Sequence, residues 1–496
     1  MSQTRRRAVG GHGRGDAVER IPIARPDRWP HPAAHRPIAP QPGGRHPSSP
    51  GAPPATAAVG APATHRPPGR TSGAGLRTAR GHARAIPVLD AVRGLSALYV
   101  LSFHVVYWLH ESGARLQERY GATKLLIAGN PLGLFGFGHQ AVIVFFVLSG
   151  FVIHLRQAQR PGERSAIGQR AWFADYARRR AIRIYAPLLF ALALTAAVGV
   201  VGTRLAGDFF GHPIRDRDEA LIVMNDNIAP LDALFVVLPI GWTFGSNGPL
   251  WSIQYEIWFY AAYVVVLLGL GDRLRVPLRR TLTAATLAAL AAWLALASGL
   301  LGHQSGLSGG HVIGWAISST AFLVMYFPIW LAGSLLAEVY ANGAVVRQRG
   351  LFAAVGLAMA VAGAAGQVPT VVESRIPFDY LFALGTVLLM ASALLRAETP
   401  RPPGRALTAS AFTAHWSYAL YAVHFPLIML VRGLWLGGDP VPSGFLLPLV
   451  GFLAGLAGGV VVWLLVERPS LRWAYRRSHR PPCRSLVGHA SNRTTV

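Results

Sequence analysis

Apolar runs of roughly 20 residues recur from Val88 to Val466, and each is long enough to cross a bilayer as a helix. The chain has 496 residues, of which 52% are hydrophobic and only 14% are charged, and its mean hydropathy is +0.36. A soluble domain carries about a quarter charged residues, so this chain lacks the polar surface that such a domain needs. Strand patterns of about ten alternating residues, which mark an outer-membrane barrel, are not evident. The sequence therefore predicts an all-α fold, a polytopic helical membrane bundle.

The bundle is predicted to have about ten transmembrane helices. These are residues 88–109, 133–155, 183–203, 250–270, 281–301, 318–340, 351–367, 378–395, 415–436 and 444–466. Arginines gather in alternate connecting segments, and the positive-inside rule places such segments in the cytoplasm. They lie before residue 86 and in segments 156–183, 273–280, 347–349, 396–405 and 468–477. Ten spans put all six segments and both termini on the cytoplasmic side.

One apolar piece, Leu231–Ile240, disturbs this count. If it crossed the membrane, the arginines of segment 273–280 would face outside, against the charge rule. It is also short for a span. We interpret it as a re-entrant or interfacial helix within an external segment, 204–249, where it would line the mouth of a cavity.

Residues 1–85 differ in composition from the rest of the chain. They are rich in Pro, Gly, Ala, His and Arg without apolar periodicity, so we predict a disordered tail. The tail also lacks the apolar core of a signal peptide. Two interpretations stay open: a cytoplasmic arm that touches anionic lipid, or an upstream start codon wrongly chosen. The predicted organisation is this tail, a transmembrane domain at 86–473 and a short cytoplasmic tail at 474–496.

The formal net charge of +25 comes almost entirely from arginine, because Lys124 is the only lysine. The arginines lie in the tail and in alternate loops, which argues against a nucleic-acid partner as the main function. Cys483 is the only cysteine, which excludes an intrachain disulfide and a Cys-based metal site. We expect no metal and no permanently bound cofactor.

The first span carries two ionisable side chains, Arg93 and His104, which are eleven residues apart. At 100° per residue they fall within about 20° of three full turns, so they share one face about 16 Å apart along the axis. Such a pair is costly in a membrane helix unless it faces a polar interior. Histidine suits proton transfer near neutral pH. The alternative, an interfacial anchor and a structurally bonded histidine, stays open.

Two further clusters lie at the starts of later spans. Arg180 and Arg183 are at positions i and i+3, where their forked guanidiniums can grip phosphate groups, although ordinary positive-inside anchoring also explains them. Glu256 lies about two turns into its span, where a carboxylate needs a cation or a proton. Tyr260 follows one turn later on the same face. A structural ion pair is the alternative for Glu256.

Together, these segments resemble the acyltransferase-3 family, in the correct order and over about residues 86–473. The resemblance rests on Asp90-x-x-Arg93 with His104, Phe145 to Ile153, Arg180-x-x-Arg183-x-Tyr185, Gly248 to Ser252 with Glu256, Ser417 to Pro426, and Val466 to Pro469. Ala141–Val144 departs from the family, whose members often carry a charged or polar residue there. Ile257-Trp258 departs as well, where another acid and a Gln are common.

The resemblance implies an O-acyltransferase of the bacterial inner membrane. It would move an acyl group, acetyl being expected, from acyl-CoA to a hydroxyl of a cell-envelope carbohydrate or a macrolide-like secondary metabolite. Its partners would be membrane lipid, acyl-CoA and that acceptor. A proton-coupled transporter is the alternative, because intramembrane His, Arg and Glu also mark proton paths, but no clear internal repeat supports it.

The resemblance also suggests a role for each candidate residue. Arg180 and Arg183 would bind the phosphates of acyl-CoA. His104 would deprotonate the acceptor hydroxyl or carry the acyl group transiently. Glu256 would orient the His104 imidazole, and Arg93 would stabilise developing negative charge.

The charge pattern makes the topology testable with reporter fusions. Cytoplasmic signals are expected after Arg160, Arg280, Arg349, Arg405 and Arg477. External signals are expected near Lys124, Arg215, Gln304, Arg375 and Gly438. An external signal after Arg280 would mean that Leu231–Ile240 is a true span and that the count of ten is wrong.

Overall fold

The computed structural model describes eleven stretches of the chain. These are residues 86–117, 121–160, 163–211, 213–215, 221–223, 228–240, 243–267, 277–297, 311–366, 376–397 and 404–478. They all belong to the second of two units, Arg80–Val496. The predicted tail at 1–85 lies outside the described residues, as do 479–496 of the predicted C-terminal tail.

Ten helices of the described chain overlap the ten predicted spans, with bounds that differ most for α6, which begins 14 residues before the predicted 183–203 span. They are α1 (Pro87–Leu109), α4 (Gly138–Ala158), α6 (Gln169–Leu205), α9 (Leu250–Val265), α10 (Leu278–Ala297), α11 (His311–Ala341), α12 (Arg349–Ala365), α13 (Ile376–Leu394), α15 (Ser417–Leu436) and α16 (Leu446–Val462). Six described helical segments are long and apolar enough to cross a membrane, within α1, α4, α6, α13 and α15 and along Leu446–Ala474. The predicted helical membrane bundle is confirmed, whereas the count of ten spans stays a prediction.

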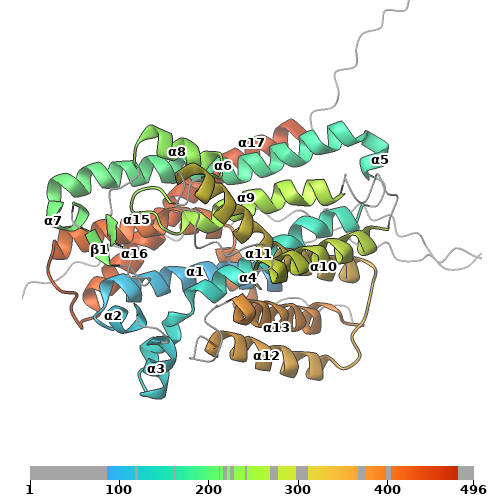
Figure 1. The fold of residues 1–496 in the computed structure, drawn as a ribbon, viewed down its shortest axis with the longest axis horizontal. Coiled ribbons are helices and arrows are strands. Elements are labelled where there is room, and N and C mark those ends of the chain that lie inside the picture. The colour runs from blue at the N-terminus through green and yellow to red at the C-terminus, as the bar shows by residue number, and fades with distance from the viewer. Residues whose placement is uncertain are drawn as a thin grey trace, which may run out of the picture. The chain divides into compact units, whose positions relative to one another are not determined.

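The remaining elements are short. They are α2 (Ser112–Gln117), α3 (Gly121–Ile127), η1 (Pro131–Gly136), α5 (Glu163–Ile167), α7 (Gly207–Phe210), α8 (Pro230–Val237), α14 (Arg405–Thr413), η4 (Trp463–Glu467) and α17 (Arg468–Ser478), with strands β1 (Pro213–Arg215) and β2 (Leu221–Val223) paired antiparallel. Helix α17 extends five residues past 473, into the segment expected to be a tail. Figure 1 shows the long helices lying side by side along one direction, with α12 and α13 as a neighbouring pair.

Helices α4 and α11 make a backbone contact through glycine. A Cβ atom on Gly150 would overlap the carbonyl of Trp330, and one on Gly333 would overlap the carbonyl of Val147. The Ser334 hydroxyl donates across the same contact to the carbonyl of Gly150, at 3.1 Å. Small residues allow this approach, and close packing is what holds helices together in lipid.

Helix α9 begins inside the bundle. Asn247, three residues before its first turn, is fully buried. Its Nδ2 donates to Thr195 Oγ1 at 3.2 Å and to the carbonyl of Ala422 at 2.9 Å. Thr195 lies in the second half of α6, and Ala422 lies five residues after the first residue of α15. The segment that leads to α9 therefore penetrates between helices.

Helix α8 contains most of the apolar segment Leu231–Ile240, whose place in the span count the sequence left open. Its eight residues span about 12 Å, too short to cross a bilayer. The hydroxyl of Tyr185 donates to the carbonyl of Val237, and Trp258 Nε1 donates to the carbonyl of Pro239. Since Trp258 is two turns into α9, the chain after α8 lies beside the bundle helices. These contacts fit the re-entrant interpretation.

The α4–α11 contact gives a stability prediction. Gly150→Ala is expected to lower the free energy of unfolding by about 1–3 kcal/mol, because the added methyl forces two backbones apart. The matched control is Gly350→Ala in α12, where nothing lies within 4 Å of the new carbon. The measurement is the thermal unfolding midpoint of the detergent-solubilised protein. Equal midpoints for the two variants would contradict the contact.

Candidate active site

A cavity between α1, α4, α6, α9 and α15 gathers four of the five predicted site residues. It holds about 900 Å³ of atom-free space, part of it open to the outside. Its polar lining consists of Asp90, Arg93, Ser149, Arg180, Arg183, Glu256, Tyr260, Ser417, Tyr418 and Tyr421. The rest of the lining is apolar and includes Leu89, Phe145, Phe146 and Ile253. Arginines and a carboxylate far apart in sequence thus share one site, whereas His104 does not line it.

Glu256 is held by hydroxyl groups. Ser149 Oγ donates to Glu256 Oε1 at 3.0 Å, and the Tyr260 hydroxyl donates to the same oxygen. Trp330 Nε1 donates in turn to Ser149 Oγ at 3.2 Å, so α11 fixes the serine that fixes the carboxylate. No ion pair of the described residues includes Glu256. Within the part of the chain that the structure describes, hydroxyl donors therefore take the place of the structural ion pair considered for this residue.

Arg180 lies against aromatic rings on the cavity wall. Its guanidinium carbon is 5.8 Å from the centre of the Tyr176 ring and 5.6 Å from that of Tyr260. The Tyr176 hydroxyl donates to the carbonyl of Tyr260, which keeps the two rings together. Cation–π contacts of this kind hold a guanidinium in place while leaving donor groups for an anion.

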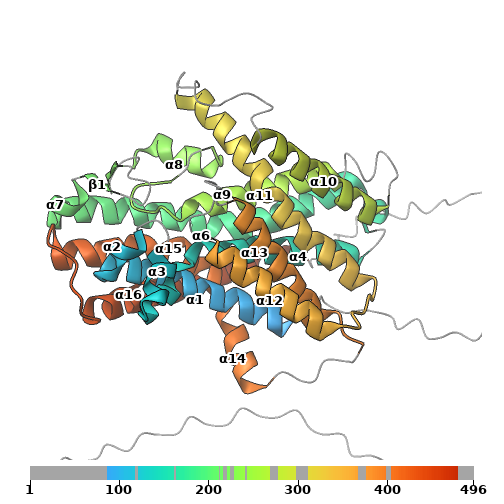
Figure 2. The same cartoon turned by 60° about the horizontal axis from the view of Figure 1, so that its bottom comes forward.

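Arg93 stands at the mouth of the cavity. Its guanidinium donates to Asp90 Oδ1 at 3.0 Å and to the carbonyl of Ala414, after α14, at 3.5 Å. Figure 2 shows α14 projecting from the bundle. Arg93 is therefore positioned both by Asp90 of its own helix, α1, and by the backbone that follows α14.

A second pocket shares Arg93 and Arg183 with the cavity. Its other lining residues are Ala414, His415, Trp463, Glu467, Arg468, Leu471 and Arg472. Arg468 and Arg472 are one turn apart on α17, so the path that leads to the cavity is basic. Glu467 is 2% exposed and accepts a hydrogen bond from the Ala419 N–H at 3.2 Å. The two shared arginines mark the boundary between a basic vestibule and the cavity.

His104 makes a different contact from the one predicted. Its Nδ1 is 3.0 Å from Nε2 of His424, on α15. The Nδ1 of His424 is 2.9 Å from the carbonyl of Tyr421 and 3.1 Å from that of Leu420. The structure does not bring Glu256 to His104. The imidazole of His104 is instead oriented by His424, which sequence reasoning did not select as a site residue.

The hydrogen-bond pattern assigns the tautomer of His104. Carbonyl oxygens only accept, so His424 Nδ1 carries a proton, and Nε2 of the neutral ring is an acceptor. His104 Nδ1 then donates to it, which leaves the lone pair of His104 on Nε2. A neutral imidazole with an oriented lone pair can act as a base or as a nucleophile.

Aromatic side chains separate the cavity from the histidine pair. Tyr421 lines the cavity, and its ring centre is 5.9 Å from that of Phe145 and 5.8 Å from that of His424. The Tyr421 hydroxyl is 2.6 Å from Ser252 Oγ, which fixes α15 to α9. Because His424 lies one turn after Tyr421 on α15, the wall that closes the cavity also touches the histidine pair.

The comparisons with known proteins decide the family. A family model, Acyl_transf_3, described as an acyltransferase domain, matches residues 86–468. The chain belongs to the acyltransferase-3 family. No curated protein and no solved structure matches it. Together with its apolar helices, the family identifies a multi-pass membrane acyltransferase.

The acyltransferase-3 match begins at the residue before α1 and ends at the first residue of α17, so it contains the whole cavity. It also contains residues that sequence reasoning did not select as site residues: Ser149, Tyr418, Tyr421 and His424. Each is a polar side chain in an apolar span, and that signal could have found them. The described residues contain no group of three or more His, Cys, Asp or Glu side chains able to hold a metal.

Proposed function

We propose that this acyltransferase moves an acyl group, acetyl being the expected one, from acyl-CoA to a hydroxyl of a cell-envelope carbohydrate or a secondary metabolite. One observation carries the proposal. Three arginines line a cavity, two of them at its mouth, and the cavity is closed near Tyr421 and Phe145 by a wall that contacts a histidine pair with an oriented lone pair. The arginine-lined cavity suits an anionic donor, and the histidine pair suits a catalyst of acyl transfer.

The donor would bind through its phosphates. The pyrophosphate would lie between Arg180 on the cavity wall and the boundary formed by Arg93 and Arg183. The remaining phosphate would lie in the vestibule beside Arg468 and Arg472. The uncharged arm of acyl-CoA would then extend into the cavity, whose walls are largely apolar. Acyl-CoA is a substrate in this scheme and leaves as free CoA.

The transfer replaces the thioester C–S bond with a C–O bond. The acceptor hydroxyl gives up its proton, its oxygen attacks the carbonyl carbon, and the sulfur leaves with the bonding electron pair and takes up a proton. His104 supplies a lone pair at Nε2 for proton transfer or for transient acyl binding. With the pyrophosphate at Arg93, about 16 Å along α1 from His104, Arg93 would act in donor binding in place of the expected stabilisation of charge on the carbonyl oxygen. The contacts of Glu256 support a role in positioning Tyr260, on which Arg180 rests, in place of the expected contact with His104.

The proposed orientation follows from the same residues. The vestibule carries arginines that the charge rule assigns to the cytoplasm, where acyl-CoA is made. The acceptor would then meet the enzyme from the far side of a bacterial inner membrane, and both termini would be cytoplasmic. Family membership favours this transfer scheme over the proton-coupled transporter.

His104→Ala is expected to abolish acyl transfer while membrane insertion and abundance stay normal, because the imidazole serves chemistry and not packing. The assay supplies labelled acetyl-CoA to membranes together with envelope glycan or culture extract, and detects O-acetyl groups by mass spectrometry. The control is His110→Ala, whose imidazole accepts a hydrogen bond from the Ser112 N–H. Full acylation by the His104→Ala protein would refute the mechanism and favour the transporter.

Arg180→Ala and Arg183→Ala are expected to raise the apparent KM for acyl-CoA roughly tenfold or more. Each removes a charge-assisted phosphate contact worth about 1.5–3 kcal/mol. Replacement by Lys should recover part of the loss, because it keeps the charge but not the fork. The control is Arg204→Ala, an exposed arginine in the last turn of the same helix. An unchanged KM in both cavity variants would place the phosphates elsewhere.

A further inference from the structure

A second histidine site lies outside the cavity. His139, in the first turn of α4, places Nε2 2.9 Å from Oδ2 of Asp379, in the first turn of α13. The Tyr326 hydroxyl, on α11, donates to the same carboxylate oxygen at 3.2 Å. Asp379 is 2% exposed, so its carboxylate is held almost entirely by protein. Three helices therefore converge on one buried carboxylate that orients a histidine.

The contacts leave one nitrogen of His139 available. A carboxylate oxygen only accepts, so Nε2 of His139 carries the proton that is donated to Asp379, and the lone pair of His139 is on Nδ1. Among the described residues, His139 has no hydrogen bond besides the one to Asp379, and its side chain is 20% exposed. This is the arrangement of a general base whose far nitrogen is oriented by a carboxylate.

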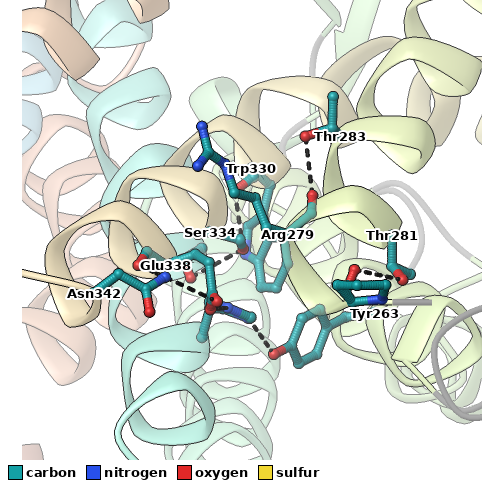
Figure 3. Close-up of polar contacts among 11 residues, drawn as sticks. Tyr263, Arg279, Thr281, Thr283, Trp330, Ser334, Glu338 and Asn342 are labelled. Atoms are coloured by element: carbon teal, nitrogen blue, oxygen red, sulfur yellow. Dashed lines mark hydrogen bonds and ion pairs between the residues drawn. The ribbon is translucent and has the colours of Figure 1, made fainter. Parts of the chain in front are cut away.

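Another histidine on the same helix provides an internal comparison. His154 is fully buried, with Nδ1 2.7 Å from the Tyr263 hydroxyl and Nε2 2.9 Å from Glu338 Oε2. Figure 3 shows Tyr263, Glu338 and Asn342 in this network, in which Asn342 also donates to Glu338. Both ring nitrogens of His154 are bonded, as expected of a histidine that ties helices together. His139 differs because one nitrogen is open.

The site lies across an aromatic layer from the donor cavity. Phe146 lines the cavity, and its ring centre is 6.4 Å from that of Trp251 and 5.8 Å from that of Tyr326. The imidazole of His139 stacks on Trp251 at 6.0 Å, with 18° between the planes. His139 also precedes the cavity residue Ser149 by ten residues, about 15 Å along α4. His139 therefore lies toward the end of α4 that is away from Ser149 and the arginines. At that end a Cβ atom on Gly138 would overlap the ring of Phe103, whose centre is 4.8 Å from that of His104, so α4 and α1 bring the two histidines to the same level of the bundle.

We propose that His139, oriented by Asp379, is the base that takes the proton of a neutral hydroxyl acceptor. This inference rests on the proposed function and deepens it, because it assigns the deprotonation to His139 and the acyl-carrying step to His104. The acceptor O–H proton moves to Nδ1, and the oxygen forms the new bond to the acyl carbon. The bond from that carbon to His104 Nε2 breaks, and its electron pair returns to the imidazole. His139 then releases the proton to water.

The experiment compares a hydroxyl acceptor with one that needs no base. Membranes receive labelled acetyl-CoA with either culture and envelope extract or hydroxylamine, whose nitrogen is already nucleophilic at neutral pH. His139→Ala and His139→Gln are expected to lower acetylation of the extract about 100-fold or more, the size of a lost general base. Formation of acetohydroxamate should stay within about twofold of the unchanged protein. Asp379→Asn should lower extract acetylation alone, by less than His139→Ala, because Asp379 acts through His139.

The controls separate chemistry from folding. His110→Ala should retain both products, and His104→Ala membranes give the background reaction of hydroxylamine with the thioester. Normal acetylation of the extract by His139→Gln would overturn the inference and leave the proposed function intact. Equal loss of both products would also overturn it, in favour of a structural tie between α4 and α13. If the unchanged protein forms neither product, the proposed function fails, and the inference fails with it.

Discussion

The backbone contact between α4 and α11 determines how the polar groups of this acyltransferase are arranged. Lipid provides no hydrophobic force between helices, so association depends on close packing and on hydrogen bonds. Gly150 and Gly333 allow the two backbones to touch. On either side of that contact, Trp330 bonds to Ser149, and Glu338 bonds to His154. A larger side chain at Gly150 or Gly333 would push the two helices apart and move Ser149, which fixes Glu256. It would do so although neither glycine lines the cavity.

The cavity and the histidine sites are kept apart by aromatic rings. Phe145 and Phe146 both line the cavity, and their rings point toward different neighbours. Phe145 contacts Tyr421, which leads to the His104–His424 pair, and Phe146 contacts Trp251, which leads to His139. Apolar rings disfavour the passage of hydrated ions, because burying a charge without a partner is costly. The proposed acyl group, being small and uncharged, is the part of the donor that such a layer can admit.

Irregular backbone at membrane depth supports the same arrangement. The turn at Asn247 is buried between α6 and α15, and its side chain bonds to both. Non-helical backbone is tolerated at that depth only where protein or a polar cavity surrounds it. Because α9 starts at this turn, Ser252 meets Tyr421 and Glu256 faces the cavity.

The sequence by itself determined the fold class and the helices, because a backbone in lipid must bond internally and apolar runs of fixed length result. It also selected Arg93, Arg180, Arg183 and Glu256, since charged groups in apolar spans are rare and need a shared polar site. Tertiary structure alone decided their partners. Periodicity places Glu256 and His104 on faces of their own helices but does not define the depth and rotation at which two helices meet. Packing set those values, so Glu256 meets Ser149 and Tyr260, His104 meets His424, and a histidine 240 residues before Asp379 becomes its neighbour.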